Sequence, residues 1–313
     1  MSSHHIDEAT AGVYVISATP FDDQGRVDKA STDSLVDFYI NAGVDGMTIL
    51  GILGEATKLT NEERLDFMAH VLKRVGGRKK IIIGASDPGT DNLVRFANEA
   101  MNQGAAGVMI APIQGLKSDA QVYGYWAHVL KQLGPDIPVC YQDYPQTTMV
   151  TTSVSVLLRL IEEFPNLVML KHEEGSGLNK ITQLREGSVQ KQLRRISVLV
   201  GNGGLYLPQE LRRGADGAMT GFAYPEMLVE VCAKFRAGEA EAAEDLFDLY
   251  LPILRHEQQL GFGLAVRKEI LRRRGIIASA HLRHPGPALT KTDHHELDNL
   301  LARLDQKLKS RAR

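Results

Sequence analysis

The chain has 313 residues, 43% hydrophobic and 24% charged, a composition typical of a globular protein with a large core. Its 36 Lys and Arg against 38 Asp and Glu give a net charge of -2, which argues against nucleic acid as a partner. No apolar run approaches the length that spans a bilayer, the start lacks a secretory pattern, and two cysteines without zinc-site spacing exclude a thiolate metal site, so a cytoplasmic protein is expected.

Short apolar runs alternate with amphipathic stretches along the first 220 residues. Each run is bounded by turn signals, as expected for parallel strands that are covered on both faces. Three of the runs follow similar segments in which a glycine lies just past a helix, at 43–47, 104–108 and 214–218. The predicted strands are residues 13–18, 46–50, 80–84, 107–111, 138–141, 168–171, 197–201 and 217–220, and the helices between them include 61–75, 90–103, 121–133, 152–164, 178–192 and 205–213.

Eight strands in strict alternation with helices predict an α/β fold of the (β/α)8 TIM-barrel class. A doubly wound sheet is the competing architecture, but it would require a glycine-rich nucleotide turn after an early strand, and none is present. We assign the barrel to residues 1–223 and a helical extension packed on it to residues 224–313. The predicted helices of this extension are 224–236, 239–260, 263–274 and 294–310.

Lys171 is the first candidate for chemistry, because active sites of this fold lie at the C-terminal ends of the strands. It ends the apolar run 168–170, and alternation along a strand places it on the same face as Met169. A buried amine is costly unless it is paired or neutral, and the neutral amine attacks carbonyl groups. The alternative is a lysine at a strand end that extends into solvent.

Two further segments could serve the same site. Tyr141 lies one β/α unit before Lys171, at a similar expected height, where a phenol could transfer protons; a packed barrel tyrosine is the alternative. The loop after the second strand has two glycines, Gly51 and Gly54, around Ile52 and Leu53, and such a loop can direct backbone N–H groups at a carboxylate. A plain turn, with Glu55 near a helix start, would also explain it.

The combination of G-x-x-G-E after the second strand, a Tyr that ends the fifth and a Lys that ends the sixth resembles the dihydrodipicolinate synthase/N-acetylneuraminate lyase family. The resemblance extends from Gly12 to the C-terminal helices. It implies a class I lyase, commonly a homotetramer, in which Lys171 forms a Schiff base with pyruvate or another 2-oxo acid and Tyr141 is the general acid/base. The implied substrate-binding residues are Gly51, Ile52, Leu53, Gly54, Glu55, Asp143, Gly201 and Met219, and no metal or organic cofactor is implied.

The chain departs from dihydrodipicolinate synthase proper at three places. Ile52 and Leu53 stand where that enzyme usually has two threonines, and the second tyrosine of its proton relay would fall near Gln114. The tyrosine loop, residues 141–147, has one extra residue and no Arg. These differences argue against condensation with aspartate semialdehyde.

Other features resemble the sugar-acid branch of the family, notably the 2-keto-3-deoxy-L-arabonate dehydratases. They are Gln142-Asp143 before a proline, His256-Glu257, and the segments 277–279 and 283–287. We therefore expect an aldolase or dehydratase acting on a 2-keto-3-deoxy sugar acid. Dihydrodipicolinate synthase is the first alternative, and a non-catalytic ligand-binding barrel is the second. Asp143 and His172 could contact a hydroxylated substrate or make structural hydrogen bonds.

Overall fold

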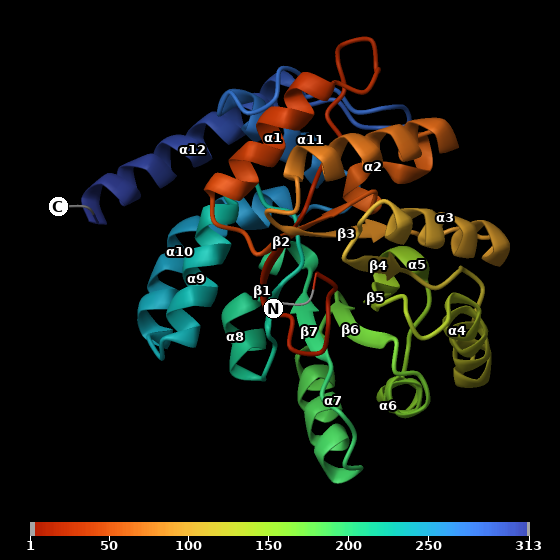
Figure 1. Ribbon diagram of the computed structural model, residues 1–313. Coiled ribbons are helices and arrows are strands. Elements are labelled where there is room, and N and C mark those ends of the chain that lie inside the picture. Colours follow the sequence, from red (N-terminus) through yellow and green to blue (C-terminus); the bar gives the residue numbers. More distant parts are fainter. Residues whose placement is uncertain (1–3, 312–313) are drawn as a thin grey trace.

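The computed structural model describes residues 4–311 and confirms the (β/α)8 barrel (Figure 1). Its eight strands are all parallel and close in sequence order, with β8 pairing to β1. The predicted strands agree with the observed ones to within two residues at each end. The strands are β1 Gly12–Ile16, β2 Gly46–Ile49, β3 Lys80–Gly84, β4 Gly107–Ile110, β5 Val139–Asp143, β6 Leu167–His172, β7 Ser197–Val200 and β8 Gly217–Ala218.

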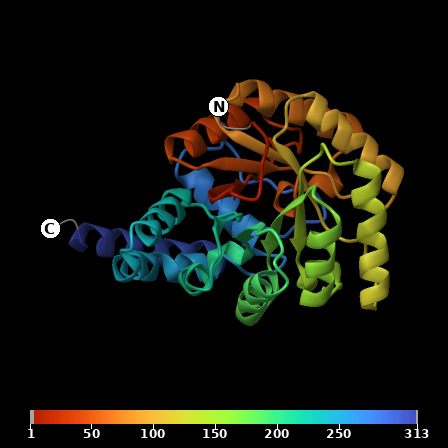
Figure 2. The same cartoon turned by 60° about the horizontal axis from the view of Figure 1, so that its bottom comes forward.

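A ring of helices surrounds the strands, as the turned view shows (Figure 2). Helix starts follow local capping signals: the Thr60 side chain accepts from the Glu63 N–H, and the Glu63 side chain accepts from the Thr60 N–H in return. The helices of the barrel layer are α1 Lys29–Asn41, α2 Asn61–Val75, α3 Thr90–Asn102, α4 Asp119–Leu133, α5 Pro145–Thr148, α6 Val154–Glu163, α7 Leu178–Gln190, α8 Leu207–Arg212 and α9 Pro225–Arg236. None of the helices within residues 4–311 has the length and apolar character needed to cross a membrane.

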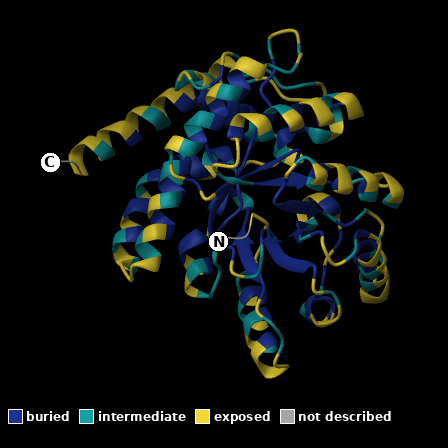
Figure 3. Ribbon diagram, in the orientation of Figure 1, coloured by how far each residue is buried: buried dark blue, intermediate teal, exposed yellow. Residues whose placement is uncertain are grey.

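The core has two layers, because successive side chains on each strand point to opposite faces. A small interior cluster fills the barrel and includes Met109, Cys140, Met169 and Met219. A larger cluster lies between the strands and the surrounding helices. The strands are accordingly buried along their length, whereas the helices expose only their outer faces (Figure 3).

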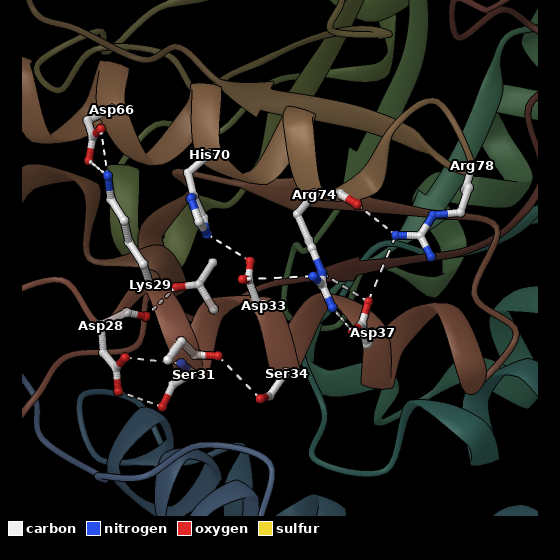
Figure 4. A network of polar contacts seen from close by, with 12 residues as sticks. Asp28, Lys29, Ser31, Asp33, Ser34, Asp37, Asp66, His70, Arg74 and Arg78 are labelled. Atoms are coloured by element: carbon white, nitrogen blue, oxygen red, sulfur yellow. Dashed lines mark hydrogen bonds and ion pairs between the residues drawn. The ribbon is translucent and has the colours of Figure 1, made fainter.

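The outer surfaces of neighbouring helices are joined by polar side chains. Between α1 and α2, His70 lies 2.8 Å from Asp33, and Arg74 pairs with both Asp33 and Asp37 (Figure 4). These side chains are partly exposed, so the network adds little to stability and mainly orients the two helices.

The C-terminal helices lie outside the barrel layer. They are α10 Ala240–Glu257, α11 Gly263–Arg273 and α12 Lys291–Arg311, and the end of α12 projects from the body of the molecule (Figures 1 and 2). The expected boundary at residue 223 falls before α9, but α9 is the helix that follows the eighth strand, and it packs on β1 and β8. The part that lies outside the barrel layer therefore begins with α10. It supplies one wall of the cavity described below.

Candidate active site

Strand β6 places Lys171 inside the mouth of the barrel. Val168 and Met169 both belong to the interior cluster, and the pairing with β5 shifts by one residue at this point. Beyond this irregularity the strand alternates, so Leu170 faces the helices and Lys171 faces the cavity. Lys171 is only 3% exposed, as expected for an inward lysine at a strand end.

Glu173 is the nearest partner of Lys171. Its Oε1 lies 2.8 Å from the lysine Nζ and accepts a hydrogen bond of 2.7 Å from Gln142 Nε2. Asn202, after β7, donates from Nδ2 to the main-chain oxygen of Glu173 at 2.7 Å. A buried amine and a buried carboxylate are thus held together by two amides, which offsets the cost of removing both charges from water.

Gly201 explains how Glu173 fits between the strands. A Cβ on Gly201 would lie 2.1 Å from Glu173 Cγ, so any larger residue at 201 would displace the carboxylate. The Gly201 N–H also donates to the His172 oxygen at 2.8 Å. Gly201 therefore makes room for the carboxylate that lies beside Lys171.

Tyr141 is not beside Lys171, contrary to our expectation. In the register of β5 and β6, Tyr141 pairs with Leu170 on the outer face, and Gln142 pairs with Lys171. The Tyr141 ring stacks on Trp126 of α4 with centroids 4.0 Å apart, and its hydroxyl bonds to Thr152. Burial raises the pKa of this hydroxyl. The height along the strand matches the prediction, but the face of the strand does not.

Tyr144 is the tyrosine that reaches the cavity. It directly precedes α5 and lines the cavity together with Lys171 and Glu173. Burial raises the pKa of its hydroxyl, the negative charge of Glu173 raises it further, and a hydrogen bond with Thr147 acts in the opposite direction. The phenol is therefore protonated near neutral pH and can donate a proton.

Asp143 also faces outward, away from the cavity. Its Oδ2 accepts from Lys180 Nζ at 2.6 Å, and Lys180 also pairs with Glu174 at 2.7 Å. His172 Nδ1 lies 3.7 Å from the same Asp143 oxygen, and its Nε2 is 3.1 Å from the Gly177 oxygen. Of the two uses considered for Asp143 and His172, the geometry supports the structural one, because this cluster holds the segment that follows β6.

The loop after β2 lies where a carboxylate could bind. Ile52 and Leu53 line the cavity at the start of a short 3-10 turn, Ile52–Gly54, whose first N–H groups have no acceptor within the turn. Gly54 ends this turn, and its oxygen accepts a hydrogen bond from the Thr19 hydroxyl at 2.7 Å. Met219 is fully buried in the barrel interior, below the cavity.

Glu55 anchors the C-terminal segment at the edge of the cavity. Its carboxylate accepts from Lys268 Nζ at 2.7 Å, from Lys58 Nζ at 2.9 Å and from the Arg283 N–H at 3.0 Å. Burial lowers the pKa of Lys268 to about 8, and Glu55 opposes this shift. Its contacts thus tie the segment around Arg283 to the barrel.

The cavity has a volume of about 330 Å³. Its walls come from the strand ends, from the loop between α10 and α11, and from the Pro-rich segment before α12. Among residues 4–311 no group of three His, Cys, Asp or Glu is placed to hold a metal ion. The polar residues that line it are Glu55, Thr57, Lys58, Gln142, Tyr144, Thr147, Lys171, Glu173, Asn202, Thr220, Glu257, Gln258, Gln259 and Arg267.

Sequence reasoning missed several of these cavity residues. Glu173 could have been found, because it lies two residues after Lys171 and so shares its face. Gln142 required the register between β5 and β6, and Tyr144 required the turn that follows β5. Arg267 comes from α11, about a hundred residues beyond Lys171, and no local pattern connects the two.

Comparisons with known proteins point to one family. The family model described as "Dihydrodipicolinate synthetase family" matches residues 9–304. An L-2-keto-3-deoxyarabonate dehydratase from Azospirillum brasilense is 31% identical over 94% of each chain. A crystal structure of dihydrodipicolinate synthase from Rhodopseudomonas palustris is 44% identical, with a TM-score of 0.93 over 96% of this chain and 99% of that one.

A third match has a bound ligand in its structure. A prophage protein of the dihydrodipicolinic acid synthase family from E. coli K12, solved in complex with pyruvate, is 25% identical. Its TM-score is 0.85 over 94% of this chain and 98% of that one. Together with the match to the family model over nearly the whole length, these similarities show that the chain is a lyase belonging to the dihydrodipicolinate synthetase family.

Proposed function

We propose that this enzyme dehydrates a 2-keto-3-deoxy sugar acid through a Schiff base on Lys171. The observation that carries the proposal is the buried pair of Lys171 and Glu173, 2.8 Å apart in a cavity large enough for a five- or six-carbon acid. An amine and a proton acceptor in contact are what imine chemistry requires. The similarity to the dehydratase from Azospirillum brasilense supports the substrate class.

The chemistry proceeds in two stages. The Lys171 ammonium transfers a proton to Glu173, and the free amine attacks C2 of the substrate. Glu173 then gives this proton to the hydroxyl of the resulting carbinolamine, which leaves as water, so that the protonated imine forms and Glu173 is a carboxylate again. Glu173 then takes a proton from C3, and the electron pair of that bond forms the C3–C4 double bond as the C4 hydroxyl leaves. Protonation of this hydroxyl by Glu173 or Tyr144 releases it as water. Hydrolysis of the imine frees the product and restores Lys171.

The other assigned residues bind the substrate or orient the catalytic groups. The N–H groups of Ile52 and Leu53 would hold the C1 carboxylate, since they open onto the cavity at the end of β2. Gln142 and Asn202 hold the Glu173 segment against Lys171. The proton-transfer role that the family resemblance implied for Tyr141 is reassigned to Tyr144, the tyrosine that lines the cavity.

Condensation of pyruvate with aspartate semialdehyde is the second candidate function. It is supported by the similarity to the dihydrodipicolinate synthase of Rhodopseudomonas palustris. Against it, Ile52 and Leu53 supply no hydroxyl for a proton relay, and the loop after β5 has no Arg for a second carboxylate. A lost charge-assisted hydrogen bond costs roughly ten- to a hundredfold in binding. The third possibility, a barrel that only binds its ligand, would not form an imine.

Borohydride trapping tests the proposal. Incubation with pyruvate and borohydride should add the reduced adduct to Lys171 and to no other lysine; Lys180 and Lys268, which are also buried, are internal controls. Because Lys171→Ala leaves Glu173 without its cation, Lys171→Ala/Glu173→Gln is the matched variant for checking the fold. Absence of an adduct, or an adduct on another lysine, would contradict the proposal.

A substrate panel then separates the candidate reactions. We expect kcat/KM for a 2-keto-3-deoxypentonate to exceed that for pyruvate with aspartate semialdehyde by roughly a hundredfold, the scale of one missing charge-assisted contact. Comparable values for the two reactions would favour the synthase. Release of pyruvate from the pentonate, in place of water, would identify an aldolase.

The family resemblance also leads us to propose a homotetramer in the cytoplasm. Two free, buried cysteines, Cys140 and Cys232, suit a reducing compartment. Sedimentation velocity measures the oligomeric state, and cell fractionation measures the location. A monomer at micromolar concentration, or an enzyme recovered outside the cytoplasm, would contradict the respective statement.

A further inference from the structure

Arg267 is a buried cation in the cavity wall that the proposed chemistry does not use. It lies on α11, is 2% exposed, and lines the same cavity as Lys171. Its Nε donates to Glu257 Oε1, and the other oxygen of Glu257 accepts from the Ala223 N–H at 3.1 Å. The guanidinium is therefore held by a carboxylate that is itself fixed to the segment after β8.

One nitrogen of this guanidinium, Nη1, has no hydrogen-bond partner in the part of the chain that the structure describes. Nη1 is buried, and within residues 4–311 no protein atom accepts a hydrogen bond from it. Leaving a charged donor unsatisfied is costly, and buried donors of this kind normally have an acceptor. In a residue that lines a substrate cavity, a ligand oxygen is a natural acceptor.

Gly221 keeps the space that the guanidinium occupies. A Cβ at this position would lie 2.0 Å from Arg267 Nη1 and 2.6 Å from Cζ. Any side chain at residue 221 would therefore push the guanidinium away. Thr220, the preceding residue, and Arg267 both line the cavity, so this guanidinium forms part of the cavity wall on the β8 side.

The charge of the site indicates which kind of ligand oxygen would accept a hydrogen bond from Nη1. Arg267 and Glu257 together are neutral, so a second carboxylate at Nη1 would bring an uncompensated negative charge into a buried site. A hydroxyl oxygen accepts the hydrogen bond without adding charge. The C1 carboxylate is assigned to the loop after β2, which leaves the β8 side for the other end of the substrate.

We infer that Arg267 Nη1 donates to a hydroxyl oxygen on the part of the substrate remote from C1, so that Arg267 selects hydroxylated 2-oxo acids over pyruvate. This inference rests on the proposed function. Arg267 touches the substrate tail and takes no part in proton transfer at C2 or C3. It is therefore a specificity-determining residue.

Two variants test the contact in different ways. Arg267→Lys keeps a cation for Glu257 but removes the forked guanidinium. Gly221→Ala leaves Arg267 and Glu257 intact and displaces Nη1. Arg64→Lys is the matched control, because Arg64 is also a buried arginine with an unpaired N–H, lies over Phe96 at 4.2 Å, and does not line the cavity.

The readout compares two ligands. Borohydride labelling gives the half-saturating concentration of pyruvate, which has no hydroxyl, and protection against that labelling gives the affinity for a 2-keto-3-deoxypentonate. For Arg267→Lys and Gly221→Ala we expect the pentonate to bind roughly ten- to a hundredfold more weakly, the scale of a hydrogen bond to a charged group. The half-saturating concentration of pyruvate should change by less than about twofold in these two variants, because pyruvate has no hydroxyl to lose the contact. Arg64→Lys should alter neither the pyruvate value nor the affinity for the pentonate.

Each other result overturns a specific statement. Equal losses for pyruvate and pentonate would mean that Arg267 serves the C1 carboxylate or the fold, and unchanged affinities would mean that water satisfies Nη1; either overturns this inference alone. A wild-type protein that pyruvate does not label overturns the proposed function, and this inference with it.

Discussion

The two faces of β5 and β6 differ sharply at their C-terminal ends, although both are polar. The inner face presents Gln142, Lys171 and Glu173 to the cavity, where a ligand can reach them. The outer face presents Tyr141 and Asp143 to helices, in contacts that protein atoms already occupy. Polar residues one position apart on a strand thus have different surroundings: those facing the cavity are the ones we propose for the chemistry, and those facing the helices are held in contacts within the protein.

The largest effect is expected at the inner face, from Glu173→Gln. The amide keeps the shape and the contact with Gln142 but cannot accept a proton, so turnover should fall by roughly 10³–10⁴. Trapping of pyruvate on Lys171 should persist at a lower rate. Turnover within tenfold of wild type would remove Glu173 from the mechanism.

Asp143→Asn tests the outer face of the same strand. It removes one of the two carboxylates that compensate the buried Lys180, and breaking a buried ion pair costs about 3–5 kcal/mol. We expect a loss of this size in the free energy of unfolding, measured by urea denaturation. If the folded variant also lost its pyruvate labelling while stability was unchanged, Asp143 would belong to the site after all.

Tyr144→Phe should act on turnover alone. The phenol is kept protonated by burial and by Glu173, so its loss removes a proton donor and slows turnover by roughly 10². Measured stability should change little. A normal rate would assign all proton transfer to Glu173.

Tyr141→Phe is the matched change on the outer face and should have the smallest effect. It removes one buried hydrogen bond to Thr152, worth about 1 kcal/mol of stability, and leaves the ring stacked on Trp126. We expect kcat within about twofold of wild type, far from the hundredfold scale of acid–base catalysis. A hundredfold loss of kcat in Tyr141→Phe, with kcat of Tyr144→Phe unchanged, would assign proton transfer to Tyr141 instead of Tyr144.

Much of this site could be predicted from local sequence. Apolar runs bounded by turn residues located all eight strands, because a buried parallel strand needs apolar side chains on both faces. Alternation from Met169 correctly placed Lys171 inside the barrel. The same rule, extended by two residues, would have added Glu173. These features depend only on the chain's own periodicity.

The tertiary structure decided which way Tyr141 faces and that Arg267 reaches the cavity, because periodicity within one strand determines neither. The face of Tyr141 depends on how β5 is aligned with β6, and the register shifts between Val139 and Cys140. A slip of one residue moves every side chain to the other face of a strand. Arg267 reaches the cavity because the helices beyond the barrel fold back over its mouth, an arrangement set by packing between distant segments. The sequence by itself determined the fold and the lysine, whereas strand alignment and long-range packing decided which groups surround that lysine.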